Sequence, residues 1–169
     1  MPFSSENGKH AIAEWVEKHK REIADVIDFG AGSGNYGKML LEIEPAFHVT
    51  AVEIFETYID KFNLYALYDK VICGDMRKIE LPEADLAICG DVLEHCAKND
   101  AVEFLHRIEA KYTHVIVSIP IGTYLQGPVF GNVFEKHLSF WSEKELYDLF
   151  IEYDLKIRYN DIAVFIRHF

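Results

Sequence analysis

Val-Ile-Asp-Phe-Gly-Ala-Gly-Ser-Gly, residues 26–34, is the stretch that decides the fold of this chain. It reads as a short apolar strand that contains one acid, Asp28, and then turns through alternating glycines into a helix. Glycine accepts positive φ and leaves room for a ligand beside the backbone. The first N–H groups of the following helix have no partner within it. Together these features indicate a nucleotide-type ligand site at the carboxyl end of a parallel strand.

Short apolar runs alternate with helical patterns along the chain. We expect strands at residues 24–29, 48–53, 70–73, 84–89, 113–119, 153–159 and 162–169. Between them, apolar residues recur at helical spacing, as at residues 36, 39, 40 and 43. This alternation predicts an α/β fold, a Rossmann-like, doubly wound and mainly parallel seven-stranded sheet. Only Asn160 and Asp161 separate the last two runs, so we expect a C-terminal antiparallel hairpin.

The composition limits what the chain can be. Its 169 residues, half of them hydrophobic, suit a single domain, residues 1–169. The formal net charge of −11 opposes anionic partners, so we expect no membrane partner and disfavour nucleic acid, although a local basic patch could still bind one. The first seven residues lack the regions of a signal peptide, and no apolar run approaches the roughly 20 residues of a membrane span. We therefore expect a cytoplasmic protein.

The cysteines are too few and too irregularly spaced for a disulfide framework or a zinc motif. Cys73 and Cys89 lie in apolar, strand-like runs, where we expect buried thiols. The sequence therefore points to a reduced protein.

Towards the C-terminus, Ser142 followed by Glu145 predicts a capping box that begins the last helix.

The glycines fit two registers that imply different ligands. Gly32, Gly34 and Gly37 give the G-x-G-x-x-G fingerprint of dinucleotide sites, whereas Gly30, Gly32 and Gly34 follow Asp28 directly. An acid at this place would repel the pyrophosphate of a dinucleotide. It suits S-adenosylmethionine, which carries an ammonium and a sulfonium group and no phosphate. Asp28 therefore favours S-adenosylmethionine, with NAD as the alternative.

Residues 26–34 resemble motif I of the class I S-adenosylmethionine-dependent methyltransferases, and further landmarks follow in the order of that family. Glu53 ends the second strand, and Gly-Asp-Met at residues 74–76 follows the third. Asp-Val-Leu-Glu-His at residues 91–95 is similar to the D-V-L-E-H run of small-molecule methyltransferases of the ubiquinone-biosynthesis type. His-Leu-Ser-Phe-Trp-Ser at residues 137–142 resembles the segment that opens the last helix in that group.

The resemblance implies a site for S-adenosylmethionine. It assigns the two ribose hydroxyls to Glu53 and the adenine to Asp75 and Met76, and it places Asp91 beside the methyl group. The cofactor-binding residues that we expect are Asp28, Gly30, Gly32, Gly34, Glu53, Asp75, Met76 and Asp91.

Other residues concern the part of the site that would bind the methyl acceptor. The stretch from Pro120 to Ser139 carries aromatic residues and a few polar groups, which suit an acceptor pocket or, alternatively, a loop whose aromatics pack on the sheet. An acceptor that must lose a proton needs a general base, and histidine is the usual base near neutral pH. His137 and His95 are the candidates. No spacing of ligand residues requires a metal, so we expect none.

We expect methyl transfer to a small-molecule acceptor, at oxygen rather than at nitrogen. The place after the fourth strand reads Gly-Asp-Val-Leu and not the Asn/Asp-Pro-Pro-Tyr/Phe of enzymes that methylate nitrogen in nucleic acid or protein. Little sequence remains for a lid, so the acceptor pocket is either open or completed by a second copy in a homodimer. Two alternatives stay open: a non-catalytic partner subunit that binds S-adenosylmethionine or S-adenosylhomocysteine, and an NAD-dependent oxidoreductase.

Overall fold

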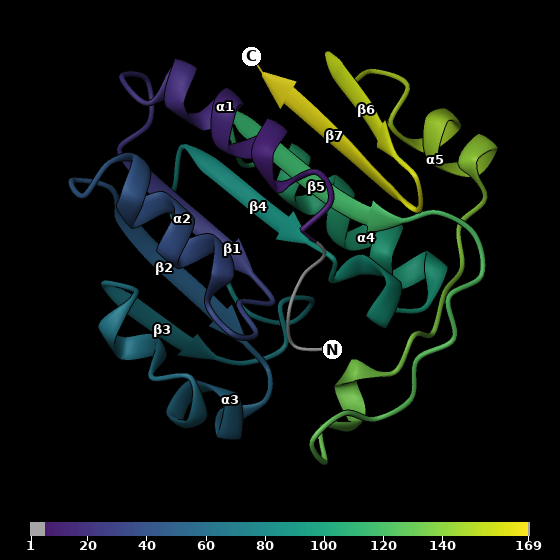
Figure 1. Cartoon of the computed structure of the whole chain (residues 1–169), viewed down its shortest axis with the longest axis horizontal. Helices are drawn as coiled ribbons and strands as arrows, with labels where there is room; N and C mark the ends of the chain where they lie inside the picture. Colours follow the sequence, from purple (N-terminus) through teal and green to yellow (C-terminus); the bar gives the residue numbers. More distant parts are fainter. Residues whose placement is uncertain (1–5, 169) are drawn as a thin grey trace.

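The computed structural model describes residues 6–168, which form one seven-stranded sheet with helices on both faces (Figure 1). The strands are β1 Asp25–Phe29, β2 His48–Glu53, β3 Lys70–Cys73, β4 Leu86–Gly90, β5 His114–Pro120, β6 Leu155–Tyr159 and β7 Ile162–His168. The helices are α1 Lys9–His19, α2 Asn35–Ile43, α3 Glu56–Lys61, α4 Lys98–Glu109 and α5 Glu143–Leu149, with 3-10 turns η1 Leu64–Ala66, η2 Leu93–His95 and η3 Val133–Glu135.

The strand order is β3-β2-β1-β4-β5-β7-β6. The first five strands are parallel, while β7 is antiparallel to both β5 and β6. The predicted sheet and C-terminal hairpin are therefore confirmed. Two predictions fall partly outside the described residues. The segment examined for a signal peptide includes residues 1–5, and the last predicted strand includes residue 169.

Helices cover the two faces of the sheet and bury two sets of alternating side chains. Ile27 and Phe29 of β1 pack in the cluster that includes α4 and α5, whereas Val26 packs with α1 and α2 on the other face. Because successive strand residues point to opposite faces, the near-continuous apolar runs of β1, β4 and β5 suit a sheet covered on both sides.

The chain changes direction at β1. From β1 it moves outward through β2 to β3, and then returns to β4 on the other side of β1. The connections after β1 and β4 therefore leave the sheet in opposite directions. In parallel sheets this arrangement opens a crevice at the carboxyl ends of the strands.

The connection between β5 and α5 is more ordered than its sequence indicates. Gly122 pairs with Trp141 in an isolated bridge, and the Glu94 carbonyl oxygen accepts bonds from the N–H groups of Leu138 at 2.8 Å and Ser139 at 3.1 Å. These bonds attach the connection to η2. The expected capping box of Ser142 and Glu145 is present at the start of α5.

One expected core residue lies elsewhere. Cys73, which we expected to be buried with Cys89, is exposed, because it ends β3 at the edge of the sheet. Cys89 and Cys96 are buried. None of the helices in residues 6–168 combines the length and the apolar character that a membrane crossing requires.

Candidate active site

A pocket lies at the carboxyl ends of β1, β2 and β4, where the topology opens the sheet. It is lined by seven of the residues expected from the sequence: Gly30, Gly32, Glu53, Asp75, Met76, Asp91 and His95. Asn132, Phe134 and Glu135 of the β5–α5 connection also line it. Three expected residues, Asp28, Gly34 and His137, are not in its lining. The structure thus brings the glycine turn, the strand ends and part of the connection to one place.

The glycine turn between β1 and α2 is held close to its neighbours. Gly30 has φ of 75°, and a Cβ at that position would lie 2.4 Å from Val92. A side chain there would therefore be strained in φ and would collide with the loop after β4. Gly34 is the left-handed N-cap of α2, with φ of 77°. The turn needs glycine for packing as well as for access to the pocket.

Glu53 connects the glycine turn to the end of β2. Its Oε2 accepts a hydrogen bond from the Gly32 N–H at 2.9 Å, and its Oε1 accepts one from the Phe55 N–H at 2.8 Å. The side chain is 4% exposed and still lines the pocket. Burial raises the pKa of Glu53, while the two N–H donors oppose that shift. The carboxyl group is thus fixed in position in the wall of the pocket.

Asp28 lies beneath the glycine turn instead of in the pocket. Its Oδ2 accepts a bond from the Tyr68 hydroxyl at 2.6 Å, and that hydroxyl accepts the Gly37 N–H at 3.1 Å. Burial raises the pKa of Asp28 to about 7, partly offset by the Tyr68 bond. A Cβ on Gly37 would lie 2.5 Å from the Tyr68 ring. Packing against Tyr68 therefore explains Gly37, the last glycine of the dinucleotide register.

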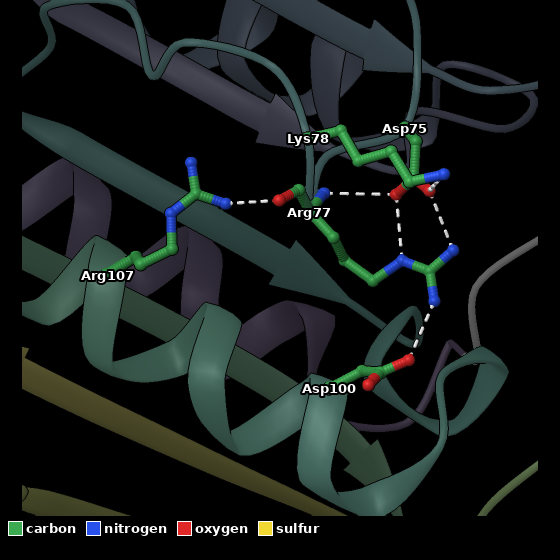
Figure 2. Close-up of polar contacts among 5 residues, drawn as sticks. All are labelled: Asp75, Arg77, Lys78, Asp100 and Arg107. Atoms are coloured by element: carbon green, nitrogen blue, oxygen red, sulfur yellow. Dashed lines mark hydrogen bonds and ion pairs between the residues drawn. The ribbon is translucent and has the colours of Figure 1, made fainter.

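Asp75 forms an ion pair with Arg77 (Figure 2). Arg77 Nε donates to its Oδ1 at 2.8 Å, and Arg77 Nη2 donates to its Oδ2 at 2.7 Å. The same guanidinium bonds Asp100 at 3.0 Å. These donors, led by the Arg77 side chain, hold the pKa of Asp75 below its usual range. The turn after β3 is thereby fixed, with Met76 in the pocket lining.

Asp91 directly follows β4 and has an unusual backbone conformation. Its φ is 53°, in the left-handed region that non-glycine residues seldom adopt. Its Oδ1 accepts a bond from the Ser118 hydroxyl at 2.7 Å, and its N–H donates to the Ser118 carbonyl oxygen at 2.9 Å. Strained residues of this kind cluster at functional sites. Neighbouring β5 thus holds Asp91 at the pocket.

The two candidate bases lie together. The rings of His95 and His137 are 4.9 Å apart between centroids. His137 Nδ1 is 2.7 Å from the Tyr124 carbonyl oxygen, and His95 Nδ1 is 3.3 Å from the Lys136 carbonyl oxygen. A carbonyl oxygen only accepts, so each Nδ1 carries the proton and each Nε2 keeps a lone pair. Burial lowers the pKa of both rings, that of His95 to about 4, so both are neutral at pH 7.

Glu94 lies close to the two histidines. Its side chain is 2% exposed, and its Oε2 has no hydrogen-bond partner among the described residues. Burial, with Asp91 nearby, holds the pKa of Glu94 well above its usual range. Ligand atoms of Glu94, His95 and His137 lie within 4.8 Å of one another, a combination of types that also suits a metal ion. The sequence expectation of no metal did not consider this cluster, because His137 is distant from the other two in sequence.

Sequence reasoning missed the residues that support the site from below. Tyr36 lines the pocket beside Gly90, where a Cβ would lie 1.9 Å from its ring. Ser118 carries a hydroxyl within the otherwise apolar residues 115–120 of β5, which is a recognisable signal. Tyr68 and Arg77 carry no local signal, because their roles depend on partners that only the fold supplies.

The raised pKa of Asp28 predicts a pH effect on stability. The unfolded carboxyl ionises near pH 4, whereas the folded one keeps its proton to about pH 7. Stability from this group is therefore present below about pH 4 and lost as the pH rises to 7. The side chain introduced by Asp28→Asn cannot ionise. We therefore expect the free energy of unfolding of this variant, relative to that of the native protein, to increase by a few kcal/mol between pH 4 and pH 8. Urea unfolding at several pH values measures this, and a difference that stays constant would contradict a proton on Asp28.

The chain matches a known family across the strands that build the pocket. Residues 26–111, about half of the chain, match a family model described as a methyltransferase domain. No curated protein matches the chain.

Solved structures share the fold at low sequence identity. The 1,6-didemethyltoxoflavin-N1-methyltransferase of Burkholderia thailandensis, crystallised with 1,6-didemethyltoxoflavin and S-adenosylhomocysteine, has a TM-score of 0.71 at 18% identity, covering 96% of this chain and 78% of that one. A protein of Pyrococcus horikoshii has a TM-score of 0.68 at 17% identity, over 99% of this chain and 95% of its own.

Mitomycin 7-O-methyltransferase has a TM-score of 0.64 at 17% identity, covering 96% of this chain. The present chain spans only 55% of the length of that enzyme. At these identities the likeness shows the fold, while the family model shows the family. The expected family and fold class are thereby confirmed: this chain belongs to the methyltransferase domain family and has the fold of the class I S-adenosylmethionine-dependent methyltransferases.

Proposed function

We propose that this chain transfers the methyl group of S-adenosylmethionine to a small-molecule acceptor, and that the cofactor binds in the pocket at the ends of β1, β2 and β4. The observation that carries the proposal is the position of Glu53, whose carboxyl group is fixed at the pocket by the N–H groups of Gly32 and Phe55. A fixed carboxylate at the end of the second strand suits the two hydroxyls of a ribose.

The charge of the pocket supports this cofactor over NAD. Four carboxyl groups line it, those of Glu53, Asp75, Asp91 and Glu135. Among the described residues that line it, Arg77 is the one arginine, and its guanidinium is already paired with Asp75 and Asp100. The Gly32 N–H, which a pyrophosphate would need, is occupied by Glu53. The negative charge of this lining favours a ligand with a sulfonium and an ammonium group and disfavours one with two phosphates.

Each part of the cofactor has residues that suit it. Glu53 would hold the ribose hydroxyls, and the backbone and side chain of Met76 would border the adenine. Asp75 acts there through the turn that Arg77 fixes, since the Arg77 guanidinium binds both of its oxygens in an ion pair. Asp91 would lie near the amino-acid end and the methyl group, and Gly30 and Gly32 would leave room for the ligand beside the backbone. Asp28 and Gly34 would support the turn from behind.

When bound, S-adenosylmethionine supplies an electrophilic methyl group on its sulfonium. The chain then has to align the acceptor with the carbon–sulfur bond, and alignment alone supplies several kcal/mol. Asn132, Phe134 and Glu135 line the side of the pocket that the β5–α5 connection covers, beside His95. This side therefore suits a small acceptor with an aromatic part and a few polar groups.

We propose oxygen as the methylated atom. A hydroxyl must lose its proton, and the free Nε2 of His137 or His95 is able to accept it at neutral pH. The related structures include both an O- and an N-methyltransferase, so the proposal rests on the two neutral imidazoles and on the Gly-Asp-Val-Leu run after β4. A non-catalytic subunit has less support, because polar groups border the acceptor side of the pocket.

The remaining expectations follow the same proposal. We propose residues 1–169 as one methyltransferase domain, because all the described strands belong to one sheet. A homodimer, a cytoplasmic location and the absence of a nucleic-acid partner stay predictions from the sequence.

Glu53→Gln tests the cofactor assignment. The amide lacks the negative charge and accepts through one oxygen only, so we expect the affinity for S-adenosylhomocysteine to fall about tenfold or more. Calorimetric titration measures this, with circular dichroism as a check on folding. Glu56→Gln, an exposed change nearby on α3, is the matched control and should bind as the native protein does. Equal affinity of Glu53→Gln and the control would refute the ribose assignment.

His137→Ala tests the base. We expect kcat to fall by about 10²-fold or more, with the affinity for S-adenosylhomocysteine unchanged, because His137 is outside the pocket lining. The assay follows release of S-adenosylhomocysteine with the best acceptor from a panel of small hydroxylated and amine-bearing molecules. His106→Ala, on the exposed side of α4, is the control. If His137→Ala turns over normally and His95→Ala does not, the base is His95, and normal turnover in both would exclude a histidine base.

A further inference from the structure

A second cluster of histidines lies at the other end of the sheet from the pocket. It forms where α1 ends, β5 begins and β7 ends (Figure 1). The antiparallel register places His114 of β5 directly opposite His168 of β7. Their rings stack with centroids 4.6 Å apart and planes inclined by 10°. His19, the last residue of α1, is 4.8 Å from His168 and stacks on Trp15 at 4.3 Å.

Two buried nitrogens of this cluster lack the hydrogen-bond partners that buried polar atoms normally have. The Nδ1 atoms of His114 and His168 are buried and make no hydrogen bond within residues 6–168. His114 is only 3% exposed. Nine in ten buried polar groups or more are hydrogen-bonded in proteins, so an unsatisfied pair in contact calls for an explanation.

A carboxylate completes a set of metal ligands. Glu22, in the turn after α1, has its Oε2 3.9 Å from His168 Nε2. Ligand atoms of Glu22, His114 and His168 lie within 4.8 Å of one another. Imidazole and carboxylate together are typical ligands of Zn²⁺, and an imidazole must be neutral to bind a metal.

We propose that Glu22, His114 and His168 form a binding site for Zn²⁺, separate from the methyltransferase pocket. The three residues come from the turn after α1, from β5 and from β7. A bound ion would therefore join the turn after α1 to the adjacent strands β5 and β7. Glu22 is exposed, which gives the ion a path from solvent and leaves its fourth position to water. His19 borders the site, with its Nδ1 on the Trp15 carbonyl oxygen at 2.7 Å.

Zinc titration of metal-free protein tests the site. Because Glu94, His95 and His137 also gather ligand atoms, every protein in the experiment carries His137→Ala. Calorimetry with ZnCl₂ should show one ion bound per chain. Removing a ligand should weaken that binding by about tenfold to a hundredfold or more. Glu22→Gln changes an exposed side chain and leaves the core intact, and His168→Gln removes an imidazole. His48→Gln, an exposed histidine at the start of β2, is the control.

Thermal unfolding gives a second reading of the same variants. Zn²⁺ binds the folded site, so it should raise the Tm of the parent and of His48→Gln, and raise it much less in Glu22→Gln and His168→Gln. Loss of both effects in the two ligand variants would support the site. No zinc binding by the parent, or equal binding by parent, Glu22→Gln and His168→Gln, would overturn it.

Discussion

The parallel pairing of β1 with both β2 and β4 is the constraint on which the rest of the structure depends. It sends the connections after β1 and β4 in opposite directions and opens the sheet at their carboxyl ends. The turns after β2 and β3 reach the same edge. A single strand order therefore collects the glycine turn, Glu53, Met76 and Asp91 at one pocket, although they are distant in sequence.

Two acids near the glycine turn have different roles. The sequence predicts that Asp28 is the acid that selects the ligand. In the structure, Asp28 is buried beneath the turn and hydrogen-bonded to Tyr68. Glu53 is the acid at the pocket, and it also occupies the Gly32 N–H. The preference for S-adenosylmethionine over a dinucleotide thus rests on Glu53 and the other carboxyl groups of the lining. Asp28 contributes to the shape of the turn.

The fold was predictable because its signals are local. The strands match their apolar runs to within about two residues, and Ser142 and Glu145 predict the start of α5. The direction of a side chain and its partners were not predictable. Arg77 takes both oxygens of Asp75, and Ser118 holds Asp91, only because the sheet brings their strands together. His114 and His168 meet through the register of β5 and β7, which no spacing in the sequence reveals.

Calorimetric titration of the native protein with S-adenosylhomocysteine and with NAD is the most direct test of the central claim, that the pocket at β1, β2 and β4 is a site for S-adenosylmethionine. S-adenosylhomocysteine keeps the ribose, the adenine and the amino-acid end, so it should bind one to one, while NAD should show no heat of binding. Binding of NAD without S-adenosylhomocysteine would contradict the claim, and binding of neither would leave the chain without the cofactor site that its fold predicts.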